Sequence, residues 1–360
     1  MKTLLKFLCI TVFLSLLCSC SQTTATSASS AQVDVALVTD VGTIDDKSFN
    51  QGAWEGIKSY CDENNVTYAY YQPEEKTDTA FLASIKEAVD RGAKLVVCPG
   101  FLFEPTVYTA QNAYPDVSFI LLDGVPHSDD YKEYGTGKNV YSIQFAEDQA
   151  GFLAGYAVVK DGYTSLGFMG GMAIPSVLRF GYGFVMGAEY AAKEMGKDGV
   201  TIRYHYTGDF SDTPENRTMA ASWYQSGTEI IFGCGGAVGN SVMASAEEYG
   251  AKMIGVDVDQ SAESETVVTS AMKMLRKSVY DGIKAYYDGT FRGGKDVTLD
   301  ASVNGVGLPM SESRFTTFTE ADYDAIYAKL KSGEIPRIMD TDYASAAELP
   351  LEAVKVRIFE

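Results

Sequence analysis

Short β-type runs alternate with helical patterns along most of the chain. In residues 49–64, Trp54, Ile57 and Cys61 fall at helical spacing and give one apolar face. Alternating strands and helices predict parallel sheets covered by helices on both faces. The predicted strands are 33–39, 66–71, 94–98, 118–122, 140–143, 166–169, 201–206, 229–232 and 252–256, and the predicted helices are 49–64, 77–91, 104–114, 175–195, 216–225 and 240–249.

The strand pattern repeats with similar spacing. Strands begin near residues 34, 66, 94 and 118, and again near 166, 201, 229 and 252. Two matching runs predict an α/β protein with two Rossmann-like lobes, each with a parallel sheet, joined by hinge crossings. Because ligands bind at the carboxyl ends of parallel strands, we expect a cleft where those ends face each other.

The N-terminus has the pattern of a targeting segment. Lys2 and Lys6 precede an apolar run over 7–18, which is shorter than the roughly 20 residues that span a bilayer. Cys20 follows a small residue, as in bacterial lipoprotein signals. We therefore expect a signal peptide over 1–19, lipidation of Cys20, a flexible tether over 20–33, and anchoring at the extracytoplasmic face of the cell membrane. An ordinary secretory peptide is the alternative.

Composition excludes several classes of function. The formal net charge is −19, from 48 acidic and 29 basic residues, which argues against nucleic acid and against a basic membrane-binding patch. The two histidines, His127 and His205, leave little room for histidine-based metal or catalytic sites. Cys61, Cys98 and Cys234 form no C-x-x-C pair and are expected to be buried free thiols. We expect no metal, no cofactor and no enzymatic activity.

One glycine-rich run resembles a nucleotide-binding loop but lacks its spacing. Over 233–239 the sequence is GCGGAVG, which places Val238 where the third glycine of G-x-G-x-x-G belongs. We interpret the run as a strand-to-helix turn in which Gly236 lets backbone N–H groups approach a ligand.

Polar and aromatic residues gather at the predicted strand ends of the first run. Asp40 ends the first strand, and Asp46 is favoured as a cap of the helix that follows. Phe49 stands in the first turn of that helix, where it offers either a stacking face or a core contact. Asp123 follows four apolar residues and is either a cap or a ligand acceptor.

The second run carries a similar set. Phe210 occupies the corresponding strand end, and Asp257 ends the strand over 252–256. Lys273 follows the apolar run over 267–272. A lysine among cleft carboxylates is a partner for ligand hydroxyls, and its alternative is a solvated charge.

These segments resemble the basic membrane protein family, whose members are substrate-binding lipoproteins of ABC transporters, purine-nucleoside receptors among them. The first motif is DVGTIDDKSFNQGAWEG over 40–56. Further similar segments are GGMAIP over 170–175, FGYGFVMG over 180–187, FSD over 210–212, GGAVGN over 235–240 and SAMK over 270–273.

The resemblance implies a type I periplasmic-binding-protein fold and a set of ligand contacts. We expect an N-terminal lobe of 34–143 plus about 271–296 and a C-terminal lobe of 144–270 plus about 297–360. Phe49 and Phe210 would sandwich a purine ring, and Asp123 would hydrogen-bond the base. The other implied contacts are Asp257 and Lys273 with ribose hydroxyls, and Asp40, Asn50 and Gly236 along the pocket.

The function that follows is capture of a nucleoside, with a purine base favoured, and its delivery to an ABC transporter permease by a monomeric, lipid-anchored receptor. A sugar in the same cleft is the nearest alternative. A surface hydrolase using Asp45 and Asp123 is a different class, and nothing else in the sequence supports it. A ligand-sensing partner of a signalling receptor has the same sequence features.

Overall fold

Two mainly parallel sheets organise the chain. The computed structural model describes residues 32–40 and 42–359, so the predicted signal peptide, Cys20 and most of the tether lie outside the described residues. Gln32–Glu360 belong to one compact unit that contains both sheets. Among the described residues, no helix is long and apolar enough to span a membrane.

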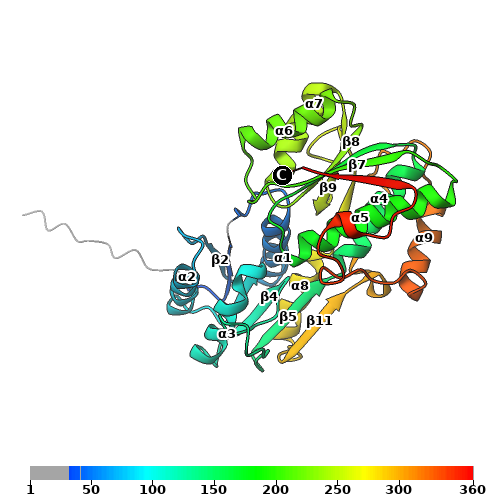
Figure 1. Ribbon diagram of the computed structural model, residues 1–360. Coiled ribbons are helices and arrows are strands. Elements are labelled where there is room, and N and C mark those ends of the chain that lie inside the picture. Colours follow the sequence, from blue (N-terminus) through cyan, green and yellow to red (C-terminus); the bar gives the residue numbers. More distant parts are fainter. Residues whose placement is uncertain (1–31, 41, 360) are drawn as a thin grey trace, which may run out of the picture. The chain divides into compact units, whose positions relative to one another are not determined.

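The first sheet has six strands, all paired in parallel. Alternate residues of its strands point to opposite faces, and the central strands are buried on both faces, which explains their continuous apolar runs. Figure 1 shows this sheet in the lower part of the view. Its strands, in spatial order, are β11 (Lys295–Leu299), β5 (Val140–Phe145), β4 (Ser118–Leu122), β3 (Leu95–Pro99), β1 (Val35–Val38) and β2 (Tyr68–Tyr71).

The second sheet has seven strands, parallel except for the β12–β10 pair. The chain passes between the sheets three times, after β5, after β10 and after β11. The α/β class with parallel sheets is therefore confirmed. The strands, in spatial order, are β12 (Val306–Gly307), β10 (Val267–Lys273), β9 (Lys252–Asp257), β8 (Ile230–Cys234), β6 (Ser165–Gly170), β7 (Val200–Tyr206) and β13 (Val354–Ile358).

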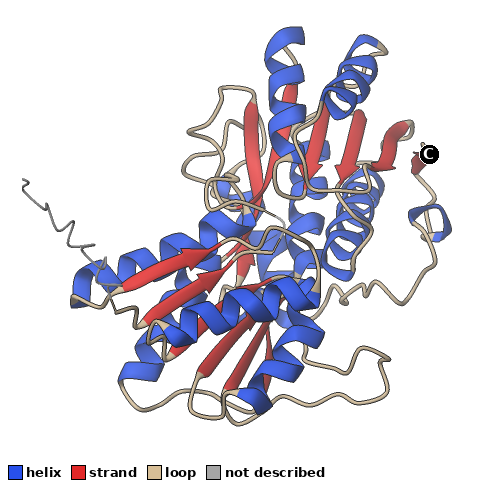
Figure 2. Ribbon diagram, turned by 90° about the vertical axis from the view of Figure 1, so that its left-hand side faces the viewer, coloured by secondary structure: helices blue, strands red, loops and turns tan. Residues whose placement is uncertain are grey.

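Helices pack on both faces of the sheets (Figure 2). On the first sheet, Ala53 and Ile57 of α1 join the core formed by Val35 and Leu37, while Phe81 of α2 belongs to the opposite core. The predicted apolar helix faces therefore become the two core layers. The helices are α1 (Phe49–Asn64), α2 (Asp78–Asp90), α3 (Glu104–Ala113), α4 (Glu147–Lys160), α5 (Pro175–Glu194), α6 (Pro214–Gln225), α7 (Val238–Tyr249), α8 (Leu275–Tyr287) and α9 (Glu320–Ser332).

Helix α4 is the main element that the hydrophobic pattern did not predict. Every residue from Glu147 to Val159 is buried, including charged Glu147 and Asp148. A helix that is buried all round has no polar face, so the 3.6-residue periodicity disappears from its sequence.

Glycines let α4 and α5 approach backbone to backbone. Gly151 and Gly155 of α4 face carbonyl groups of α5, and Gly183 and Gly187 of α5 face carbonyl groups of α4. A Cβ atom at any of these four positions would collide with the backbone of the opposite helix. The reciprocal spacing of four residues places each glycine pair on one helix face, which allows this close packing.

Replacing Gly155 tests this contact. In Gly155→Ala the new methyl group meets the carbonyl oxygen of Phe184, and a backbone atom cannot move aside as a side chain can. We expect a loss of about 3 kcal/mol or more in the free energy of unfolding, the upper end of overpacking effects. Urea unfolding measures it. Gly135→Ala is the control, because a Cβ there meets no atom within 4 Å, and equal stability of the two variants would contradict the interpretation.

Candidate functional site

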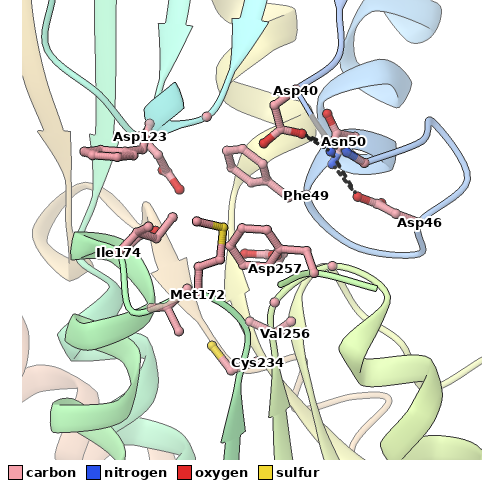
Figure 3. A pocket seen from close by; sticks show the side chains of 18 of the residues that line it. Asp40, Asp46, Phe49, Asn50, Asp123, Met172, Ile174, Cys234, Val256 and Asp257 are labelled. Carbon is pink, nitrogen blue, oxygen red and sulfur yellow. Dashed lines mark hydrogen bonds between the residues drawn. The ribbon is translucent and has the colours of Figure 1, made fainter. Parts of the chain in front are cut away.

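A cavity of about 250 Å³ lies where the carboxyl ends of strands from both sheets meet. This is the expected place for a ligand in a parallel α/β sheet, and the volume suits one compact molecule. Figure 3 shows Asp123, Phe49, Met172 and Ile174 around it. All eight residues predicted to contact ligand line this cavity, namely Asp40, Phe49, Asn50, Asp123, Phe210, Gly236, Asp257 and Lys273. Their role as ligand contacts stays a prediction.

The start of α1 forms one wall of the cavity. Asp46 accepts backbone N–H groups of Ser48, Asn50 and Gln51, which confirms the predicted capping role. Burial raises the pKa of Asp46 to about 6, although these hydrogen bonds oppose the rise. The Asn50 amide donates to Asp46 and to Asp40, at 3.2 and 3.1 Å (Figure 3). Two carboxylate neighbours fix the amide orientation, and Asn50 Oδ1 is buried without a hydrogen-bond partner among the described residues.

Lys273, the last residue of β10, is buried among three carboxylates. Its Nζ lies 2.5 Å from Asp123, 3.5 Å from Glu147 and 3.6 Å from Asp257. The same atom lies 4.8 Å from the centre of the Phe49 ring. Burial alone would lower the pKa of Lys273, but the carboxylates outweigh it and raise that pKa, so the ammonium stays charged. The alternative of a solvated lysine is wrong.

Asp123 and Asp257 reach the cavity through unusual backbone. Both have positive φ, 58° and 67°, where residues other than glycine carry strain. Asp257 accepts from the Ser48 hydroxyl at 2.5 Å, which joins the start of α1 to the second sheet. Asp123 follows a strand and caps no helix, and its Oδ1 is buried without a hydrogen-bond partner among the described residues. That oxygen can accept a hydrogen bond from an N–H or O–H group of a ligand in the cavity.

The pKa of Asp123 is raised to about 7. Burial is the largest cause, Lys273 opposes it, and the neighbouring carboxylates of Glu147 and Asp257 add to it. Lys273, together with Arg179 beside Glu147, brings two positive charges to three carboxylates, so the excess negative charge favours a proton on Asp123.

Phe210 rests on the glycine-rich turn. A Cβ atom on Gly171 would collide with its ring, and one on Gly235 would lie 2.9 Å from it. The Ala237 N–H donates to the Phe210 carbonyl at 3.0 Å. The turn over 233–239 therefore seats the phenylalanine, and this N–H is used within the protein rather than turned toward the cavity.

Two charged residues next to the site were missed by the sequence analysis. Glu147 begins α4, and Arg179 of α5 donates to it at 2.7 Å. Burial raises the pKa of Glu147, but Arg179 and Lys273 outweigh burial and lower it overall. Arg179 stands between Leu178 and the mainly apolar segment 180–187. A charged residue inside an apolar helix was the signal from which its buried role could have been predicted. Most of the other lining residues that were not predicted are apolar, among them Phe101, Leu102, Met172, Ile174, Val177, Phe180 and Val256, and the polar ones are Thr43, Asp46, Ser176 and Ser211.

The carboxylate pair considered for hydrolysis is not assembled. Asp45 is exposed and does not line the cavity that contains Asp123. Cys61, Cys98 and Cys234 are buried free thiols, as predicted. Within the part of the chain that the structure describes, no cluster of three or more His, Cys, Asp or Glu side chains is placed to hold a metal ion.

Comparison with known proteins identifies the family. Residues 33–339 match the family described as "ABC transporter substrate-binding protein PnrA-like" (Bmp). The "ABC transporter nucleoside-binding protein BmpA" of Lactococcus lactis subsp. cremoris is 32% identical over 301 residues, 77% of this chain and 82% of that protein. "Basic membrane protein D" of Borreliella burgdorferi is 30% identical over 306 residues, 83% of this chain and 84% of that protein.

A solved structure shows the same fold. A solute-binding protein of an ABC transporter system from Aeropyrum pernix K1 superposes with a TM-score of 0.72 at 24% identity, covering 84% of this chain and 91% of that one. The predicted type I periplasmic-binding-protein fold and the resemblance to the basic membrane protein family are thus both confirmed. This chain belongs to the PnrA-like family of ABC transporter substrate-binding proteins.

Proposed function

We propose that the chain captures a nucleoside with a purine base in the cavity at the strand ends and delivers it to an ABC transporter permease. The observation that carries the proposal is the assembly, in one small cavity, of Phe49, Phe210 and Asp123 Oδ1, a buried acceptor with no hydrogen-bond partner in the described part of the chain. Flat rings stack on aromatic side chains, and a buried acceptor favours a ligand with an N–H donor. The Lactococcus relative is named as a nucleoside-binding protein, which agrees with this proposal.

The proposed receptor acts as a monomer held at the extracytoplasmic face of the membrane by lipid on Cys20. Its ligand stabilises a closed arrangement of two lobes, with the crossings between the two sheets as the hinge. Asp257 and Lys273 are the proposed contacts for the ribose hydroxyls, and Asp40, Asn50 and Gly236 line the rest of the ligand.

Thermal unfolding against a ligand panel tests the proposal. The panel holds purine and pyrimidine nucleosides, free bases, pentoses and nucleoside 5′-monophosphates. We expect purine nucleosides to stabilise the protein by about 2.7 kcal/mol at one hundred times their dissociation constant. Monophosphates should stabilise it far less, because Lys273 in the cavity already faces three carboxylates.

Other outcomes of the panel would point elsewhere. Stabilisation by pentoses without nucleosides would replace the nucleoside by a sugar. Chromatography of the recovered ligand is the control for chemistry, and release of free base from a nucleoside would contradict a receptor.

Replacing Phe49 by leucine tests the stacking role. Leucine keeps an apolar contact but removes the flat face, and base stacking on an aromatic ring is worth about 1–3 kcal/mol. We expect Phe49→Leu to bind a purine nucleoside roughly ten- to a hundredfold more weakly by titration calorimetry. Phe291→Leu is the control, because Phe291 packs on Tyr141 and Tyr286 away from the cavity lining. Unchanged affinity in Phe49→Leu would remove the stacking role.

The affinity should depend on pH through Asp123. In the ligand-free protein this carboxyl carries a proton below its raised pKa of about 7. Because Oδ2 faces the Lys273 ammonium, that proton occupies Oδ1, the oxygen proposed to accept a base N–H. Binding must then release a proton, so affinity should fall about tenfold for each pH unit below 7 and level off above it. Calorimetry in buffers of different ionisation enthalpy measures the released proton.

Asp123→Asn is the control for this dependence. It should bind more weakly and lose the change centred near pH 7, keeping only what Asp46, with its pKa of about 6, contributes. A wild-type affinity that stays constant from acid to alkaline pH would show that Asp123 does not accept from the ligand.

A further inference from the structure

Five side chains of alternating charge run from the surface into the cavity, and we call them the charge ladder. Asp340, in the segment after α9, lies 2.7 Å from Arg179 Nη1, and Arg179 Nε lies 2.7 Å from Glu147 Oε2. The other oxygen of Glu147 faces Lys273 Nζ at 3.5 Å, and Lys273 in turn contacts Asp123 at 2.5 Å. The ladder thus joins a surface segment, two helices, a strand end and a loop.

Glu147 is the central member of the ladder and the most buried. Its side chain is 0% exposed, against 16% for Asp340 at the outer end. A buried carboxylate without a partner costs several kcal/mol, so the charge of Glu147 depends on the two cations beside it. Arg179 occupies one oxygen with a short hydrogen bond, which leaves the other directed at the Lys273 ammonium. Arg179 therefore fixes the Glu147 carboxylate, and Glu147 in turn fixes the position of the Lys273 ammonium.

We propose that Glu147 and Arg179 are positioning residues for ligand binding, which fix the Lys273 ammonium and set the charge that Asp123 experiences. The inference rests on the proposed function, since it takes Lys273 and Asp123 as ligand contacts. Neither Glu147 nor Arg179 lines the cavity, so both act on the ligand through Lys273.

The ladder also carries an excess of negative charge. Lys273 and Arg179 face four carboxylates, once Asp257 is included. Removing a carboxylate near Asp123 should therefore lower the pKa of Asp123. Besides its five members, the titratable groups that face the ladder are Asp257 from β9, Cys234 from β8, Glu104 from α3, Asp148 from α4 and Tyr182 from α5.

Glu147→Gln separates positioning from a purely structural role. The amide keeps the shape but removes the charge beside Lys273, which then moves toward Asp123 and Asp257. The affinity is measured at pH 8.5, about 1.5 units above the pKa of Asp123, where Asp123 is ionised. We expect the variant to bind a purine nucleoside about tenfold more weakly, the scale of losing one charge-assisted hydrogen bond from Lys273 to the ligand. The midpoint of the affinity–pH profile should also move down by about one unit, because Asp123 loses a neighbouring negative charge.

Asp148→Asn is the matched control. Asp148 is the next residue of α4, is equally buried, and pairs with Arg337 of the same surface segment, but it makes no contact with Lys273. It should lower stability while leaving the pH midpoint in place. A midpoint that is the same in wild type, Glu147→Gln and Asp148→Asn would overturn the inference, and so would equal shifts in both variants.

If Glu147→Gln does not fold, a second variant tests the same inference. Asp340→Asn removes the outer charge of the ladder, where the side chain is 16% exposed, and should move the midpoint in the same direction by a smaller amount. An unchanged midpoint in folded Asp340→Asn would then overturn the inference. Failure of the proposed function looks different, because the wild type itself would bind no nucleoside.

Discussion

The site depends on the pairing of the buried Lys273 ammonium group with the carboxylates around it. Lys273 ends a strand of the second sheet, while Asp123 follows a strand of the first, so their 2.5 Å contact ties the ends of the two sheets together. A buried charge must be paired, and the chain supplies three carboxylates from three elements to do so. Two of these residues, Asp123 and Asp257, have a left-handed backbone conformation at the position from which they contact Lys273.

The close pair of helices α4 and α5 provides the rigid base for this charge. Their glycines bring the backbones together, and Glu147 and Arg179 stand on facing helices at the cavity end of that contact. A small side-chain change inside the helix pair would therefore displace the charge ladder as well as the core. The packing of this region and its electrostatics are coupled, because the glycine contacts and the Glu147–Arg179 pair lie on the same two helices.

The sequence was informative where a residue's position relative to a strand end decides its role. Phe49 and Asp123 follow or begin elements whose boundaries the apolar pattern marks, so their presence in one cavity could be predicted. Glu147 could not be predicted, because α4 is buried on all sides and shows no helical period. Lys273 was predicted to belong to the cleft, but its pairing depends on residues 123, 147 and 257, whose proximity only the fold establishes.

The distribution of unused hydrogen-bonding atoms bears on the kind of ligand that the cavity suits. Asp46 accepts three backbone N–H groups at the start of α1, while Asp257 accepts from the Ser48 hydroxyl and faces Lys273 at 3.6 Å. Among the residues that the structure describes, the buried side-chain atoms of the cavity lining without a hydrogen-bond partner are two acceptors, Asp123 Oδ1 and Asn50 Oδ1. Binding a ligand without donors would leave them unpaired, and an anionic ligand would meet an excess of carboxylates. A neutral molecule with a flat ring and several N–H and O–H donors meets both constraints, and the proposed nucleoside is such a molecule.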